Sequence, residues 1–263
     1  MNQIVRIIPV LFIKNGLIVR SQNFSRHQFL GNVIEQAQRL NDYNVDELVY
    51  IDISRDSNYE LGTRKDALVK SKNDIISIIK DISKVCFMPL TIGGKIKSVK
   101  DAVIRIRAGA DKIIINSLLL KKLNIVKKII SEIGSQAVVA SIDYKVVDGK
   151  LIIFTDYGNT NTNIELLDFV KKLEKIEVGE IFVQNIDFDG AQSGFDIESI
   201  KKIVKKTSLP IIACSGAGEA DHFKEVLKIK NLTAVAAGNY FNYKERSYPL
   251  IKKELKKSKI NVR

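Results

Sequence analysis

The chain has 263 residues, 45% of them hydrophobic, so it can bury the core of one large barrel or of two small domains. No apolar stretch approaches the length of a membrane-spanning helix, which excludes a protein that crosses a membrane through helices. The formal net charge is +12, but the lysines lie mostly in helix-like segments beside Ile and Leu, which is typical of solvated helix faces and disfavours nucleic-acid binding.

Few residues of this chain favour metal or disulfide chemistry. Cys86 and Cys214 lie in apolar, strand-like segments, and we expect two buried, reduced thiols. His27 and His222 are far apart with no metal-ligand spacing around them, so we expect neither a metal nor another cofactor. The apolar run at 7–13 has no basic region before it and no cleavage site after it, so we predict a strand and a cytoplasmic protein.

Apolar, strand-like runs alternate with helical patterns along the whole chain. Continuous apolar runs suit parallel strands that are buried on both faces. Eight alternations predict an α/β fold, a single closed (β/α)8 TIM barrel over 1–263. An open doubly wound sheet is the rival, but no G-x-G-x-x-G follows the first strand. The expected strands are 4–13, 47–53, 87–92, 111–117, 136–143, 180–187, 209–215 and 233–238, and the expected helices are 31–44, 73–84, 98–107, 119–133, 163–175, 196–206, 219–229 and 245–258.

The two halves of the chain resemble each other. MPLTIGGK (88–95) parallels LPIIACSG (209–216), and GADKIIINS (109–117) parallels NLTAVAAGN (231–239). This self-similarity predicts two half-barrels of about 1–134 and 135–263 with two related ligand sites on opposite sides of the mouth.

Two stretches interrupt the alternation. The segment 54–72 is long, polar and charged, and it is either a functional loop after the second strand or a solvated insertion. The segment 144–156 carries an Asp-Gly turn between apolar runs, which predicts a β-hairpin after the fifth strand.

Several polar residues lie at the C-terminal ends of the predicted strands, where barrel enzymes have their active sites. Asp143 ends an apolar strand, so its carboxyl could have a raised pKa and act as a general acid or base; the alternative is a structural cap on the next hairpin. The other candidates at strand ends are Asp52, Asn116, Ser117, Asp187, Asp189, Ser215 and Asn239.

Small, Gly-rich turns also follow several strands. Glycine lets a backbone approach a phosphate closely, although tight turns need it anyway. IGGK pairs with SGAG, and INS pairs with AGN, through the half-repeat, which predicts a ligand with two phosphates. The residues concerned are Gly94, Lys95, Asn116, Ser117, Gly190, Gly216, Gly218, Gly238 and Asn239.

Charged residues enter the strands at the opposite end of the predicted barrel. Buried charges are tolerated only when they are paired, so two bases and two acids could form a ring that plugs the barrel floor. Ordinary surface charge at strand starts is the alternative. The four residues are Arg6, Glu47, Lys112 and Glu180.

Nearly the whole chain resembles the HisF family, the cyclase subunit of imidazole glycerol phosphate synthase. The resemblance is carried by VDELVYIDI, GADKIIINS, GSQAVVASIDYKVVDGK, EIFVQNIDFDGAQSGFD, LPIIACSGAG and INVR. It implies a barrel that receives ammonia from a glutaminase subunit docked on its N-terminal floor. At the mouth the ammonia would react with a bisphosphate ribotide, giving imidazole glycerol phosphate and an aminoimidazole carboxamide ribotide.

The resemblance also implies residue roles. The four floor charges occupy the ammonia gate, and Asp111 sits where the family meets its glutaminase. Asn116 and Ser117 match one phosphate site, and Gly190, Gly216, Gly218 and Asn239 match the other. Asp143 matches one of the family's two catalytic aspartates.

Three departures from the family lie at the mouth. Phe12 stands where the first catalytic aspartate is expected, and no Asp or Glu occurs before Glu35. Lys95 replaces the third Gly of a glycine triplet, and the loop 54–72 is enlarged. Retained floor charges with a changed mouth suggest that ammonia delivery is kept and that the acceptor differs.

NFSRHQFLGN and VCFMPL are more similar to a branch of the family associated with surface-polysaccharide and flagellar sugar amidation. The alternatives are a histidine-pathway cyclase that uses Asp143 with Asp189 or Asp52, and a non-catalytic ammonia conduit. In each case we expect a glutaminase partner.

Overall fold

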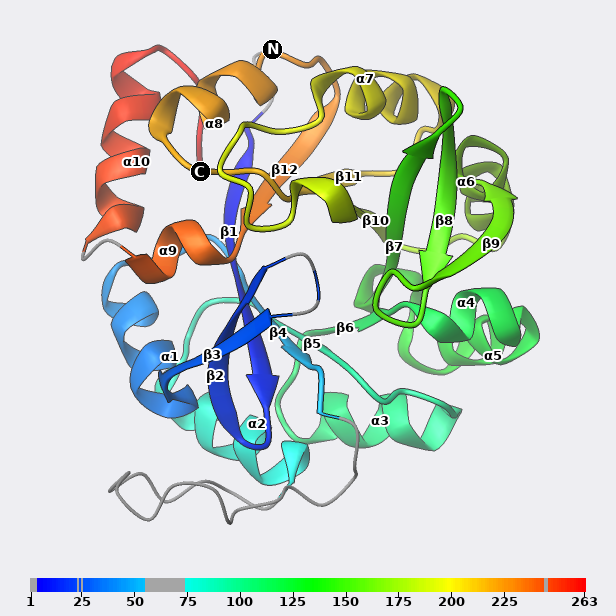
Figure 1. Ribbon diagram of the computed structural model, residues 1–263. Coiled ribbons are helices and arrows are strands. Elements are labelled where there is room, and N and C mark those ends of the chain that lie inside the picture. Colours follow the sequence, from blue (N-terminus) through cyan, green and yellow to red (C-terminus); the bar gives the residue numbers. More distant parts are fainter. Residues whose placement is uncertain (1–3, 23, 25, 55–73, 244–245) are drawn as a thin grey trace.

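Eight parallel strands form a closed barrel. The computed structural model describes residues 4–22, 24, 26–54, 74–243 and 246–263 (Figure 1). β12 pairs with β1, and β10 pairs with β7, so no edge of the eight-stranded sheet stays open. The predicted (β/α)8 barrel is confirmed. Its strands are β1 (Arg6–Lys14), β4 (Leu48–Asp52), β5 (Leu90–Gly93), β6 (Lys112–Ile115), β7 (Val138–Val147), β10 (Glu180–Asn185), β11 (Ile211–Cys214) and β12 (Leu232–Ala237).

Helices surround the strands (Figure 1). Side chains fix several helix starts: Asp74 accepts a hydrogen bond from the Ser77 amide, and Ser98 accepts one from the Asp101 amide. No helix in the described part of the chain is long and apolar enough to span a membrane. The helices are α1 (Val33–Asp42), α2 (Ile75–Val85), α3 (Val99–Arg107), α4 (Ser117–Lys121), α5 (Leu123–Ile133), α6 (Leu166–Lys175), α7 (Ile197–Lys206), α8 (Ala220–Val226), α9 (Asn239–Tyr243) and α10 (Ser247–Lys257).

Antiparallel strands extend the barrel at its mouth. The hairpin predicted at 144–156 is confirmed, since β7 pairs with β8 (Lys150–Thr155). A third strand, β9 (Thr160–Glu165), continues it, so the helix predicted from residue 163 begins only at Leu166. The hairpin of β2 (Leu17–Gln22) and β3 (Arg26–Asn32) after β1 was not predicted. These extra strands are polar or mixed, so they lack the continuous apolar run that marked the barrel strands.

Three further expectations need correction or fall outside the described residues. The helix expected over 119–133 is broken at Lys122 into α4 and α5. Cys86 is half-buried at the end of α2 and not buried in a strand, because β5 begins only at Leu90. Burial still raises the pKa of the Cys86 thiol to about 11. The loop 54–72 lies outside the described residues from residue 55 onward.

Alternate side chains of the strands face two separate apolar layers. One layer packs between the strands and the helices, and the other fills the barrel interior. On β10, for example, Ile181 and Val183 face the helices, whereas Phe182 faces the interior. The interior layer consists of Ile8, Val10, Val49, Ile114, Val139, Phe182, Ile212, Cys214, Ala234 and Ala236, with Phe12 and Ile51 packed against it.

A buried polar cluster attaches α10 to the floor end of β1. The Asp46 carboxylate accepts a hydrogen bond from the Ile7 amide at 2.8 Å and pairs with the Lys252 ammonium at 2.8 Å. The Tyr248 hydroxyl accepts from the Asp46 amide and donates to the Ile7 carbonyl. The last long helix is thereby joined to the first strand across more than 200 residues of sequence.

Replacing Asp46 with Ala is expected to lower the free energy of unfolding by about 2–4 kcal/mol, because it leaves a buried amide without its acceptor and a largely buried ammonium without its carboxylate. Urea denaturation measures this change. Lys201→Ala, which removes an exposed ion pair with Glu198, is the matched control and should change the stability by less than about 0.5 kcal/mol. Equal effects of the two variants would contradict the prediction.

Candidate functional site

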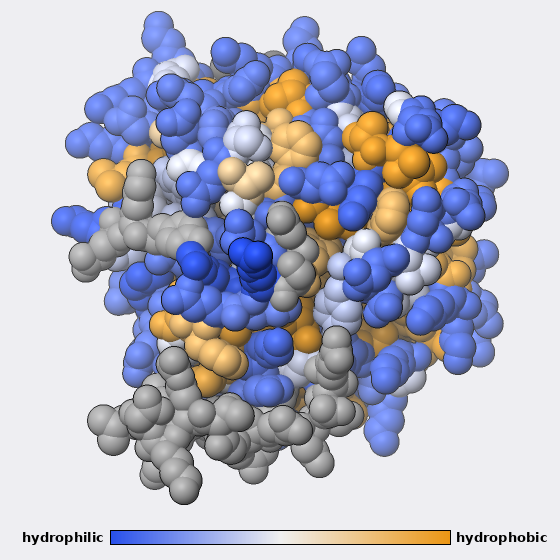
Figure 2. Space-filling view, viewed as in Figure 1, coloured by the Kyte–Doolittle hydropathy of each residue, from blue (hydrophilic) through white to orange (hydrophobic). Residues whose placement is uncertain are grey.

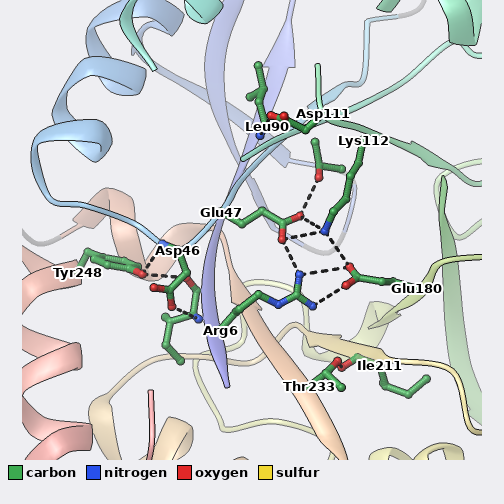
Figure 3. A network of polar contacts seen from close by, with 12 residues as sticks. Arg6, Asp46, Glu47, Leu90, Asp111, Lys112, Glu180, Ile211, Thr233 and Tyr248 are labelled. Atoms are coloured by element: carbon green, nitrogen blue, oxygen red, sulfur yellow. Dashed lines mark hydrogen bonds and ion pairs between the residues drawn. The ribbon is translucent and has the colours of Figure 1, made fainter. Parts of the chain in front are cut away.

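The four charged residues at the barrel floor form a closed ring of ion pairs (Figure 3). The Arg6 guanidinium lies 2.6 Å from a Glu47 carboxylate oxygen and 2.8 Å from a Glu180 carboxylate oxygen. The Lys112 ammonium lies 3.2 Å from Glu47 and 3.3 Å from Glu180. Each charge therefore touches two partners of opposite sign, and the alternative of ordinary surface charge at strand starts is wrong.

The carboxylates of the ring favour the charged form of Arg6. Burial alone would lower the pKa of Arg6, but the Glu180 and Glu47 carboxylates outweigh it and raise that pKa. The Thr91 hydroxyl donates to Glu47 at 2.8 Å, so the buried Glu47 carboxylate has three partners. Such pairing offsets the cost of removing charges from water.

Asp111 lies beside this ring on the floor and is held by the backbone of β5 (Figure 3). Its carboxylate accepts from the Leu90 amide at 2.8 Å, and its own amide donates to the Leu90 carbonyl at 2.9 Å. The residue is nevertheless exposed. Its role as a glutaminase contact stays a prediction.

Asp143 ends the inward-facing row of β7 at the opposite, mouth end of the barrel. The Asn116 side-chain amide, at the start of α4, donates to its carboxylate at 2.8 Å. Burial raises the pKa of Asp143 to about 7, the Asp189 charge adds to this rise, and the Asn116 hydrogen bond opposes it. A carboxyl with this pKa can both give and take a proton near neutral pH.

Asp189 follows β10 and the short 3₁₀ helix Ile186–Phe188, and it contacts the β2–β3 hairpin. The Ser21 hydroxyl donates to its carboxylate at 3.0 Å, and the Phe24 amide donates at 3.2 Å. Burial raises the pKa of Asp189, and these two hydrogen bonds oppose the rise. Asn239 donates to the Ser21 carbonyl at 2.7 Å, so the hairpin is tied to both Asp189 and α9.

Phe12 packs against the interior layer near the end of β1 and forms a wall of an open pocket at the mouth. The pocket is also lined by Asp189, Gly190, Gly216, Gly238 and Asn239. It therefore brings together Phe12, one predicted catalytic residue, three of the four residues predicted for the second phosphate site (Gly190, Gly216 and Asn239) and the predicted ligand-binding glycine Gly238. Its remaining lining residues are Val10, Gln184, Cys214, Ser215, Ala217 and Ala237.

Two of the glycines predicted for this phosphate site, Gly216 and Gly218, differ in their surroundings. A Cβ on Gly216 would lie 1.8 Å from the Gly194 carbonyl oxygen, so only glycine fits there. Gly218 does not line the pocket, and its amide donates to His222 Nδ1 at 3.1 Å. Its contact with a phosphate stays a prediction.

The other predicted phosphate site is arranged differently. The Lys95 ammonium lies 3.3 Å from the buried Asp52 carboxylate, and Lys95 keeps the left-handed backbone that the replaced glycine would allow, with φ of 55°. A Cβ on Gly94 would lie 2.2 Å from the Asp52 carbonyl oxygen. Asn116 is turned toward Asp143, and Ser117 begins the short helix α4. Lys95 and Asn116 thus already bind protein carboxylates.

Sequence reasoning missed two parts of the mouth. The Ser21 hydroxyl and the Phe24 amide belong to the unpredicted β2–β3 hairpin. Gln184 lies in the strand predicted over 180–187, and the period of two from Glu180 places it on the inward face. That spacing could have identified Gln184, whereas no spacing signal identified the hairpin contacts.

The sequence matches a known protein family and several of its members. Residues 6–247 match the model of the histidine biosynthesis protein family. The chain is 37% identical to the imidazole glycerol phosphate synthase subunit HisF of Saccharolobus solfataricus, over 90% of each chain. It is 33% identical to the HisF subunit of Bacillus cereus strain G9842 and 34% identical to that of Sulfurisphaera tokodaii, over 98% of each chain.

The family match spans residues 6–247 and therefore includes the floor ring, the barrel interior and the mouth. The chain belongs to the histidine biosynthesis protein family and, within it, to the HisF subunits of imidazole glycerol phosphate synthase.

Proposed function

We propose that this chain is the ammonia-accepting barrel subunit of a glutamine-dependent complex whose acceptor has diverged toward a surface sugar that carries an acetamido group. The observation that carries the proposal is the combination of a complete ion-pair ring at the floor with Phe12 beside the mouth pocket. One end of the barrel retains what ammonia entry requires, while the other lacks one carboxyl of the family's acid–base pair.

The floor supports the glutaminase half of the proposal. In its closed form the ring of Arg6, Glu47, Lys112 and Glu180 separates the apolar interior from the floor surface, so it would act as the ammonia gate. Ammonia is small and uncharged, so an apolar interior would favour it over ammonium and over water-borne ions. Phe87, in the loop before β5, is 85% exposed at this end, and Ile4, just before β1, is 60% exposed. Exposed apolar side chains around a charged centre suit a protein partner.

The mouth supports a changed acceptor. Asp143 retains a pKa suited to proton transfer, but Phe12 cannot exchange a proton. One half of the mouth keeps an open, glycine-lined pocket, whereas Lys95 in the other half is paired with Asp52. These features fit an acceptor bound mainly through one phosphorylated end.

A histidine-pathway cyclase is the second candidate, and Asp189 favours it. Its buried carboxyl lines the same pocket as Phe12 and has a raised pKa, so it could replace the missing acid. The two candidates differ in whether the formimino ribotide of histidine biosynthesis is turned over.

Turnover of that ribotide with excess ammonium salt at alkaline pH separates the candidates without a glutaminase. We expect no turnover by the unmodified protein and measurable turnover by Phe12→Asp, because the substitution restores the second carboxyl. Adding Asp143→Asn to Phe12→Asp should reduce the rate about 10²–10⁴-fold. Turnover by the unmodified protein would instead favour the histidine pathway.

The raised pKa of Asp143 predicts a pH-dependent stability. The unfolded carboxyl ionises near pH 4, and the folded one near pH 7, so the folded state binds more protons between these values. The contribution is therefore present below pH 4 and is lost as the pH rises to 7, by about 2–4 kcal/mol in total. Urea denaturation of Asp143→Asn across pH 4.5–8 should lack this decrease. The same pH profile in both proteins would contradict the assignment.

Docking of a glutaminase on the floor is tested with Phe87→Asp. A charge in the centre of an apolar contact should weaken binding of a histidine-type glutaminase subunit at least about tenfold. Leu250→Asp, at a residue 55% exposed on α10, is the control and should leave binding unchanged. Isothermal titration calorimetry measures both. Equal binding by Phe87→Asp would exclude this part of the floor as the docking surface.

A further inference from the structure

Gln184 places a carboxamide inside the barrel mouth. On β10 the inward-facing side chains are Glu180 in the floor ring, Phe182 in the interior layer and then Gln184. Gln184 is only 4% exposed, yet it lines the mouth pocket. Its side chain thus lies on the boundary between the apolar interior and the open pocket.

The Gln184 carboxamide has no hydrogen-bond partner within the described part of the chain. The neighbouring polar residue on the same strand, Asn185, faces the other way and donates to Asp196 at 2.6 Å. Buried amides are nearly always satisfied, because an unpaired donor or acceptor costs free energy. A buried carboxamide that opens only toward a pocket is therefore arranged to bind something that enters the pocket.

The residues around Gln184 define the surroundings of a ligand group that binds its carboxamide. Gln184 is in register with Asp143 on β7 and with Cys214 on β11. Phe12 and Asp189 line the same pocket. Burial raises the pKa of the Cys214 thiol, so Cys214 stays uncharged beside the amide. Gln184 thus lies directly opposite Asp143 in the pairing of β10 with β7, whereas Asn116 reaches the same carboxyl from the start of α4.

We propose that Gln184 is a specificity-determining residue that binds a carboxamide group of the acceptor beside Asp143. A side-chain carboxamide presents N–H donors and a carbonyl acceptor in one plane, and another amide is the group that matches both. A carboxylate would only accept hydrogen bonds, and an ammonium would only donate them. A single hydroxyl has one O–H group and does not match the N–H donor and the carbonyl acceptor of the carboxamide together. Phe12 provides an apolar wall of the same pocket.

This inference rests on one part of the proposed function, namely that the acceptor binds at the mouth. Both candidate acceptors carry the required chemistry, as the acetamido group of a sugar or as the carboxamide of an imidazole ribotide. A site built to hydrogen-bond such a group rejects the analogue that lacks it.

Calorimetric titration with two ligand pairs tests the inference. One pair is N-acetylgalactosamine 1-phosphate and galactose 1-phosphate, and the other is aminoimidazole carboxamide ribotide and aminoimidazole ribotide. In at least one pair, the unmodified protein should bind the amide-bearing member about tenfold more tightly. In Gln184→Met the preference should fall below about twofold, with the Kd of the other member unchanged.

Two further variants serve as controls. Gln184→Leu repeats the test with a second apolar side chain, and Gln136→Met, at an exposed glutamine on the floor side, should keep the full preference. An unchanged preference in both Gln184 variants, or no preference in either pair, overturns the inference. Binding of the ribotide pair with no binding of the sugar pair overturns the sugar acceptor alone. Absence of binding by all four compounds counts against both proposals.

Discussion

The pairing of four charges at the barrel floor constrains the whole interior. Arg6, Lys112 and Glu180 are the first residues of their strands, and Glu47 directly precedes β4. Their side chains must all point inward to reach one another. Because side chains alternate along a strand, this requirement fixes which residues of each strand face the interior up to the mouth. A shift of one residue in any of these strands would break the ring and exchange the inner and outer faces of that strand.

That constraint leads directly to the groups at the mouth. From Arg6 the inward row on β1 runs through Ile8 and Val10 to Phe12, and from Glu180 the row on β10 runs through Phe182 to Gln184. The strand alternation that turns the charged residues inward at the floor therefore also decides which side chains face the pocket at the mouth. The mouth ends of these rows line the pocket, whereas the floor ring is built from residues at the starts of the strands.

The two halves of the mouth are related in sequence but differ in structure. SGAG borders an open pocket, whereas IGGK lies beside an ion pair between Lys95 and Asp52. The sequence showed that Lys95 replaces a glycine. It could not show that the Lys95 ammonium pairs with Asp52, because that contact depends on the packing of β4 beside β5. The barrel, the ring and Asp143 could be predicted because each follows from period and position within one strand. The β2–β3 hairpin could not, because its strands are only half-buried and its contacts with Asp189 join residues more than 160 positions apart.

The pairing of β1 with β12 has a consequence for how the chain reaches this structure. Arg6 aligns with Ala234, so the seam joins the beginning of the fold to nearly its last strand. Closing it brings together distant segments at a high entropic cost, and topologies with such long-range contacts fold slowly. During synthesis, β1 can pair with β4 long before β12 leaves the ribosome, and until then its other edge is an unpaired, apolar strand. Productive folding in the cell thus depends on keeping that edge from pairing with other chains until the last quarter of the protein has been made.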